Sequence, residues 1–141
     1  MSSATHMERP GILVLSHGPL CTALIESARM IAGDVEGVQA LPLEPGRDVA
    51  AYADQACALL DAMPEGSIVL FDLFAGTPFN QVIARFRERS LPALCGVSLP
   101  MLLDANTMRE TLSGQELIRA VEESAHESLV NVADFLSAMQ T

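Results

Sequence analysis

The alternation of short apolar runs with longer amphipathic stretches is the feature that most constrains the fold of this chain. The apolar runs cover residues 12–15, 38–43, 67–71 and 94–99. Apolar residues also recur at helical spacing over residues 20–31, 49–63, 79–88, 101–112 and 115–126. Continuous apolar runs suit parallel strands that are covered on both faces. The alternation therefore predicts an α/β fold with a parallel sheet and right-handed crossovers.

The boundaries of these segments carry turn and cap signals. Gly33 follows the first helical stretch, where a left-handed glycine commonly ends a helix, and Asp48 is a favourable N-cap for the second. Residues 45–46 and 64–66 contain proline and glycine, which form turns. The apolar residues of the tail, 128–139, fit either a helix or a short strand, so both structures stay open for this segment.

The composition is that of a globular protein. The chain has 141 residues, enough for one domain, and half of them are apolar, which argues against disorder. No apolar run approaches the roughly 18 to 20 residues that span a bilayer, and the polar first residues do not resemble a secretory signal peptide. Residues 1–6 resemble an artificial leader before a natural start at Met7. We therefore expect a single cytoplasmic domain over residues 7–141.

The charge and the cysteines exclude several function classes. The formal net charge is −10, and all 8 basic residues are arginine. Nucleic acids and anionic membrane surfaces require a positive footprint, so a protein partner with a basic face fits this charge better. Cys21, Cys57 and Cys95 are odd in number and form no C-x-x-C pair. We interpret them as small apolar core residues.

Polar residues follow three of the predicted strands, at the edge where open α/β sheets bind ligands. His17 ends the first strand, Asp72 the third and Ser98 the fourth. In a flavodoxin-like three-layer sheet with strand order 2-1-3-4, the first and third strands are neighbours, which brings His17 beside Asp72. A carboxylate that accepts a hydrogen bond from one imidazole nitrogen fixes the tautomer and leaves the other nitrogen free to attack an electrophile. We therefore interpret His17 as a nucleophile that Asp72 orients.

A Gly-Thr-Pro sequence predicts a helix that begins beside this pair. Thr77 is a favourable N-cap, Pro78 suits the first helical position, and Gly76 permits close approach to the backbone. The first predicted helix also begins shortly after Gly18. Two helix N-termini with open N–H groups then face one place, which predicts a site for an oxyanion or phosphate.

Each of these residues also has an ordinary structural interpretation. A lone histidine is commonly just exposed, an aspartate after a strand commonly caps a turn, and Gly-Thr-Pro commonly only starts a helix. Their joint placement at matching strand ends favours a shared site. His6, in the leader, and His126, on a polar helix face, lack such neighbours. Arg85, Arg87 and Arg89 are interpreted as a solvent-exposed helix face.

Three motifs of this chain match those of one protein family in order and spacing. They are Ser16-His17-Gly18, Phe71-Asp72-Leu73-Phe74-Ala75-Gly76-Thr77-Pro78-Phe79-Asn80, and Gly96-Val97-Ser98-Leu99-Pro100-Met101-Leu102. The chain thereby resembles the EIIA component of the mannose-type (mannose, fructose, sorbose, N-acetylgalactosamine) phosphoenolpyruvate-dependent sugar phosphotransferase system. The resemblance extends from about residue 11 to the C-terminal helix.

The resemblance implies a role for each motif. His17 matches the histidine that is phosphorylated, Asp72 matches the aspartate that hydrogen-bonds its other ring nitrogen, and Thr77 matches a small hydroxyl residue beside the phosphate. Gly18 and Gly76 are the glycines expected at the phosphate. The same motifs supply the residues expected to contact protein partners, which are Phe74, Pro100 and Met101.

The resemblance also implies a fifth, antiparallel strand that is exchanged between the subunits of a homodimer. Residues 128–133 are the segment expected to form it. The chain departs from the family pattern at Ala75, which replaces the first glycine of a Gly-Gly pair, and at Ser98, which replaces an asparagine. A negative φ at Ala75 would leave the approach of a phosphate unchanged.

The implied function is that of a phosphocarrier with phosphotransferase activity. It accepts a phosphoryl group from phospho-HPr on His17 and passes it to an EIIB component, which is expected to be a separate protein and which serves membrane EIIC and EIID partners. No cofactor is expected, because the donor is a protein phosphohistidine, and no metal is expected, because no second histidine or cysteine joins His17 in the motifs. Three alternatives remain: a regulatory phospho-acceptor EIIA module, a phosphotransferase subunit that serves dihydroxyacetone kinase, and a module that binds a small anion at His17. The sequence does not identify the sugar, because EIIA does not touch it.

Overall fold

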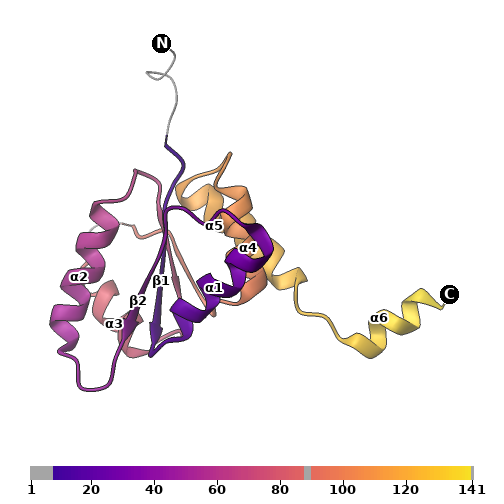
Figure 1. The fold of residues 1–141 in the computed structure, drawn as a ribbon, viewed down its shortest axis with the longest axis horizontal. Coiled ribbons are helices and arrows are strands. Elements are labelled where there is room, and N and C mark those ends of the chain that lie inside the picture. The colour runs from indigo at the N-terminus through magenta and orange to yellow at the C-terminus, as the bar shows by residue number, and fades with distance from the viewer. Residues whose placement is uncertain (1–7, 88–89, 141) are drawn as a thin grey trace, which may run out of the picture.

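A computed structural model describes residues 8–87 and 90–140 of the chain. The predicted leader at residues 1–6 with His6, the proposed start at Met7, and Arg89 of the arginine group lie outside the described residues. Four parallel strands form one sheet in the order β2-β1-β3-β4, as predicted (Figure 1). The strands are β1 (Ile12–His17), β2 (Val38–Leu43), β3 (Ile68–Phe71) and β4 (Ala93–Cys95).

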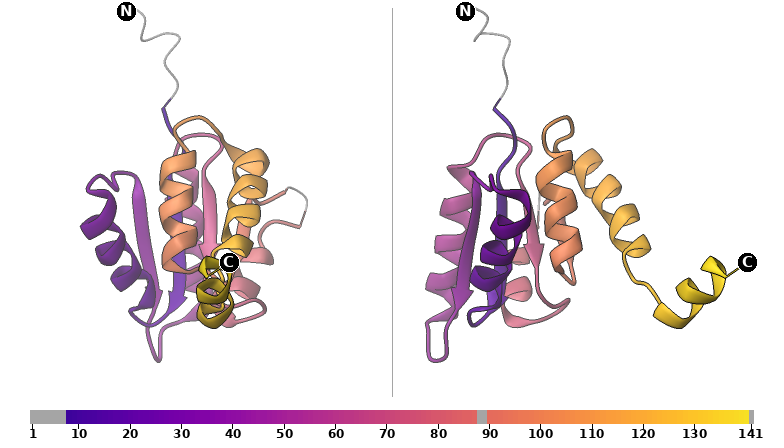
Figure 2. Two further views of the ribbon diagram at one scale, coloured as in Figure 1. Left: turned by 90° about the vertical axis from the view of Figure 1, so that its right-hand side faces the viewer. Right: turned by 45° about the vertical axis from the view of Figure 1, so that its right-hand side comes forward.

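Helices cover both faces of this sheet and make three layers (Figures 1 and 2). The helices are α1 (Leu20–Ala32), α2 (Val49–Asp61), α3 (Thr77–Ile83), α4 (Leu99–Met108), α5 (Gly114–Glu127) and α6 (Val132–Met139). Residues Ile12 and Val14 of β1 join a buried cluster with α1, α4 and α5. Residues Leu13 and Leu15 join a second cluster with α2 and α3. This alternation follows from the period of two along a strand, and it assigns each position of β1 to one face.

Most helix boundaries agree with their sequence signals. Gly33 ends α1 with a φ of 79°, and the side chain of Asp48 accepts hydrogen bonds from the first N–H groups of α2. Helix α4 begins at Leu99, two residues earlier than predicted, because Ser98 is its N-cap and its hydroxyl accepts a hydrogen bond from the N–H of Met101. The residue that departs from the family pattern therefore has a local structural role.

Helix α3 is shorter than the predicted 79–88, and it ends at Ile83. Phe86 lies 9% exposed in the cluster beneath α2 and α3, and the guanidinium of Arg85 donates hydrogen bonds to the side chain of Asp54 and the carbonyl of Gln81. Arg85 and Arg87 are exposed, as expected, but they follow the end of α3, so the expectation that they lie on a helix was wrong.

The tail does not form the strand expected over residues 128–133. Residues 129–131 connect α5 to α6, and Asn131 caps α6 by accepting a hydrogen bond from the N–H of Asp134. The helix lies away from the sheet and its covering helices (Figure 2). An Asn cap followed by two alanines, a leucine and a methionine favours a helix when no neighbouring strand supplies hydrogen bonds. Within residues 8–87 and 90–140, the sheet therefore has four strands.

Candidate functional site

His17 and Asp72 meet at the carboxyl ends of β1 and β3, as predicted. The N–H of Asp72 donates a hydrogen bond of 3.0 Å to the carbonyl of Leu15, which holds Asp72 beside β1. Its carboxylate atom Oδ2 lies 2.8 Å from Nδ1 of His17 and accepts a second hydrogen bond, of 2.9 Å, from the backbone N–H of His17. The Asp72 side chain is 9% exposed and that of His17 is 46% exposed. The pair is therefore anchored on one side and open to solvent on the other.

The contact with Asp72 determines which nitrogen of the imidazole carries the proton. A carboxylate oxygen only accepts hydrogen bonds, so Nδ1 carries the proton that faces Oδ2, and Nε2 carries the free lone pair. The other oxygen of Asp72, Oδ1, is buried and has no hydrogen-bond partner among residues 8–87 and 90–140. Within those residues, the hydrogen bonds that the Asp72 side chain accepts thus come from His17. An attack by Nε2 would leave positive charge on a ring that already faces an anion.

The edge of the imidazole that carries Cε1 and Nε2 lies close to Gly76. A Cβ added to Gly76 would stand 2.7 Å from Cε1 and 3.3 Å from Nε2 of His17. Gly76 has a φ of −78°, which any residue adopts, so this position requires glycine for space. Gly18 is different, because its φ is 60° and no described atom lies within 4 Å of the place that a Cβ would occupy. At Gly18 the requirement is conformational.

The prediction for the start of α3 was wrong. Thr77 is the first residue of α3 and Gly76 is its N-cap, so the first turn of this helix has no side-chain cap and Pro78 takes the second helical position. Ala75 has a φ of 64°, in the left-handed region that favours glycine, so the negative φ that would leave the approach of a phosphate unchanged is not present. Its carbonyl accepts a hydrogen bond of 3.0 Å from the side-chain amide of Asn80, which holds the loop in this shape.

The residues expected to contact partners divide into exposed and buried ones. Phe74 is 70% exposed, and Pro100 is also exposed. Met101 is only 6% exposed and belongs to the core cluster with α1 and α5, so its expected contact role was wrong. Sequence reasoning missed Leu20 and Leu73, which are 46% and 57% exposed in the segments that follow His17 and Asp72. Their apolar character next to the polar motif residues was the available signal.

Cys95 lies at the end of β4, the strand beside β3. Burial raises the pKa of its thiol, and the negative charge of Asp72 raises it further. A thiol in this state is a poor nucleophile, because the thiolate is the reactive form. This agrees with the interpretation of the cysteines as core residues, since Cys21 is fully buried and Cys57 is half-buried.

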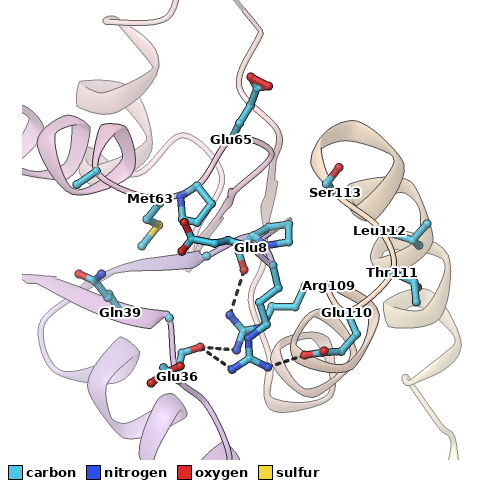
Figure 3. Close-up of a pocket in the computed structure, with 16 residues that line it drawn as sticks. Glu8, Glu36, Gln39, Met63, Glu65, Arg109, Glu110, Thr111, Leu112 and Ser113 are labelled. Atoms are coloured by element: carbon cyan, nitrogen blue, oxygen red, sulfur yellow. Dashed lines mark hydrogen bonds and ion pairs between the residues drawn. The ribbon is translucent and has the colours of Figure 1, made fainter. Parts of the chain in front are cut away.

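A cavity of about 680 Å³ lies at the opposite, amino end of the strands (Figure 3). The guanidinium of Arg9 binds the carboxylates of Asp34 and Glu110 there. Arg109, which is 1% exposed, donates hydrogen bonds to the carbonyls of Pro10 and Glu36. These contacts tie the chain before β1 to the segments before β2 and after α4. They give Arg9, Arg109 and Glu110 a role as structural links.

Metal-binding clusters and membrane-spanning helices are both absent from the described part of the chain. Within it, no group of three or more His, Cys, Asp and Glu side chains is arranged to hold a metal ion. No helix in residues 8–87 and 90–140 has the length and apolar character needed to cross a membrane.

Known proteins share this architecture and sequence pattern. The family model EIIA-man, described as the fructose IIA component of the PTS system, matches residues 11–122. The fructose-specific EIIA component of Bacillus subtilis is 29% identical over 133 residues, which are 92% of this chain and 91% of that protein. The sorbose-specific EIIA component of Klebsiella pneumoniae is 29% identical over 117 residues, which are 82% of this chain and 86% of that protein. The crystal structure of EIIA from Streptococcus agalactiae matches with a TM-score of 0.80 at 26% identity, covering 88% of this chain and 98% of that one.

The sheet order and these matches define the class of protein. The chain is an EIIA component of the phosphotransferase system, whose members are phosphotransfer proteins. It belongs to the mannose-type family of these components, which the family model identifies over residues 11–122.

Proposed function

We propose that this EIIA component carries its phosphoryl group on Nε2 of His17, accepts it from phospho-HPr and passes it to an EIIB component in the cytoplasm. The observation that carries the proposal is the 2.8 Å contact between Nδ1 of His17 and Oδ2 of Asp72. It leaves Nε2 as the ring nitrogen with a free lone pair, on a side chain that is 46% exposed.

The transfer step follows from this arrangement. The lone pair of Nε2 forms a bond to the phosphorus of the donor phosphohistidine, and the donor's P–N bond breaks with its electron pair returning to the donor imidazole. The proton on Nδ1 of His17 stays in its hydrogen bond to Asp72, whose negative charge stabilises the phosphorylated imidazolium. In the transfer to EIIB, the acceptor forms the new bond to phosphorus, and the bond from phosphorus to Nε2 of His17 breaks with its electron pair returning to the imidazole. No other group is consumed.

The surface around His17 suits the docking of a protein. Leu20, Leu73 and Phe74 expose apolar area in the segments that follow His17 and Asp72, and Pro100 exposes more at the start of α4. The ring of Phe74 packs against that of Phe79, with ring centroids 5.1 Å apart. This contact supports Phe74 in its exposed position. Exposed aromatic and leucine side chains beside a reactive group are typical of contact surfaces. The net charge of −10 favours partners with a basic face.

The test is phosphorylation by HPr, its upstream kinase and phosphoenolpyruvate. We expect acid-labile phosphate on the wild-type protein, none on His17→Ala, and wild-type labelling on His126→Ala, which removes a histidine in the last turn of α5. Asp72→Asn should slow transfer about a hundredfold while the fold is retained, because the amide lacks the stabilising charge. Label that persists in His17→Ala would refute the nucleophile, and an unchanged rate in Asp72→Asn would refute the orienting role.

The acceptor is tested separately. Phosphorylated protein should lose its label to EIIB. Transfer to a dihydroxyacetone kinase subunit instead, or retention of the label in the presence of EIIB, would contradict the carrier role and favour a different acceptor or a regulatory one.

We also propose that the chain forms a homodimer through its tail. Leu129, Val130, Val132, Phe135, Leu136 and Met139 are all between 51% and 90% exposed. So many exposed apolar side chains on one segment are typical of a surface that is buried against another protein chain. The double variant Phe135→Glu with Leu136→Glu should be monomeric at micromolar concentration, whereas the wild type should have twice that mass. A monomeric wild type would contradict the proposal.

A further inference from the structure

We infer that Ser16 is a positioning residue for His17, an inference that rests on the proposed function of that histidine. Ser16 is fully buried, one residue before His17 in β1. Its hydroxyl donates a hydrogen bond of 2.9 Å to the carbonyl of Gly18 and accepts one of 2.9 Å from the backbone N–H of Cys21. The hydroxyl therefore spans the segment that connects β1 to α1.

This hydroxyl serves as the cap of α1 from outside the helix. The N-cap residue is Pro19, whose side chain has no acceptor, and no side-chain cap bond comes from it. The N–H of Cys21, in the first turn, is instead bound by Ser16. A buried N–H without an acceptor is strongly unfavourable. This bond therefore fixes the position of the first turn of α1 relative to the end of β1.

The same hydroxyl fixes the backbone that carries the imidazole. Gly18 has a φ of 60°, its N–H donates a hydrogen bond of 2.8 Å to the carbonyl of Leu43, and its carbonyl is bound by Ser16. The backbone N–H of His17 is bound by Asp72. Ser16 thus holds the segment from the α1 side while Asp72 holds it from the β3 side.

The two neighbouring side chains act on opposite faces of the sheet. Successive residues of a strand point to alternate faces, and Ser16 has the parity of Ile12 and Val14, which face α1. His17 has the other parity, and its ring lies against Gly76 at the start of α3. Ser16 therefore reaches the imidazole only through the backbone, which makes its role one of positioning.

Ser67, at the other end of the sheet, provides a matched control for the substitution of Ser16. The hydroxyl of Ser67 also joins one carbonyl and one N–H, since it donates to Pro64 over 2.6 Å and accepts from Gly11 over 2.7 Å. Ser67 is 7% exposed and precedes β3 at its amino end, away from His17. Ser67→Ala removes the same pair of bonds as Ser16→Ala, but it leaves the segment after β1 unchanged.

The experiment compares Ser16→Ala, Ser16→Thr and Ser67→Ala in two measurements. Single-turnover transfer from phospho-HPr should be about tenfold slower or more in Ser16→Ala, because about 1 Å of displacement at a reacting group lowers rates about a hundredfold and about 0.5 Å therefore lowers them about tenfold. It should stay within about twofold of wild type in Ser67→Ala, and Ser16→Thr, which keeps the hydroxyl, should recover most of the rate. The ¹⁵N shifts of the His17 ring, measured without phosphate, should show a single Nδ1–H tautomer in wild type and Ser67→Ala, and a mixture in Ser16→Ala.

The outcomes separate the two proposals. Wild-type protein that takes no phosphate on His17 refutes the proposed function, while the tautomer measurement still tests Ser16. Labelled wild type together with Ser16→Ala that matches Ser67→Ala in rate and in ring shifts refutes the positioning role. If Ser16→Ala does not fold, Ser16→Cys replaces the hydroxyl by a thiol, which is a weak donor and a weak acceptor, and a wild-type rate and tautomer in that variant refute the role as well.

Discussion

Replacing Gly76 by alanine tests the geometry of the site most directly. The added Cβ would lie 2.7 Å from Cε1 of His17, whereas ordinary contacts of a Cβ begin at 3.4 Å. The ring must therefore retreat by about 0.7 Å, because the backbone of Gly76 is fixed by the start of α3. Its retreat lengthens or bends the 2.8 Å contact with Asp72.

The expected effect on the rate follows from this displacement. Since about 1 Å of misplacement lowers a rate about a hundredfold, about 0.7 Å predicts a decrease of roughly twentyfold. This corresponds to about 1.8 kcal/mol of activation free energy. The free energy of unfolding should change by less than about 1 kcal/mol, because a φ of −78° suits alanine and only the cap preference is lost.

The assay is single-turnover transfer from phospho-HPr, with urea unfolding measured on the same samples. Gly114→Ala is the control, because Gly114 has a φ of 55° at the start of α5 and no described atom lies within 4 Å of the added Cβ. It should lose about 1 kcal/mol of stability and keep its rate. A Gly76→Ala rate within twofold of wild type, or an equal decrease in Gly114→Ala, would refute the reasoning.

Three further predictions concern stability. Ala75→Gly should raise the free energy of unfolding by about 0.5 kcal/mol, because it removes the strain of a φ of 64°, and a lower urea midpoint would contradict this. Burial raises the pKa of Tyr52, the one tyrosine of the chain, so its contribution to stability is complete below the unfolded pKa of about 10 and is lost as the pH rises above it. Urea midpoints should then fall above about pH 10 more steeply in wild type than in Tyr52→Phe, and parallel curves would exclude this linkage. Arg109→Met should lose about 2 to 4 kcal/mol of stability, because it leaves buried carbonyls unbound, yet retain the transfer rate per folded molecule, and a slower rate would connect the cavity to His17.

The general fold and the central pair were predictable because they depend on local patterns. Apolar runs separated by helical stretches specify parallel strands, and the rule for ligand sites at strand ends then selects His17 and Asp72. Asp48 and Gly33 were assigned correctly as helix ends because capping involves only neighbouring residues.

The errors occurred where distant segments decide a local conformation. Helix α3 stops at Ile83 because Phe86 enters the core and Arg85 reaches Asp54, contacts that no local period encodes. Met101 was expected on the surface because its motif adjoins the site, but the rotation of α4 directs it into the core.

From sequence alone, this chain is an α/β protein with a histidine and an aspartate at one edge of its sheet, and its motifs resemble those of the mannose-type EIIA family. Tertiary structure decided that Asp72 binds Nδ1 of His17, that Gly76 is needed for space and not for its backbone conformation, and that Ala75 takes a positive φ. Sequence patterns report the period and burial of single elements. The distances between side chains depend on how β1, β3 and α3 pack, and packing is a property of the whole core.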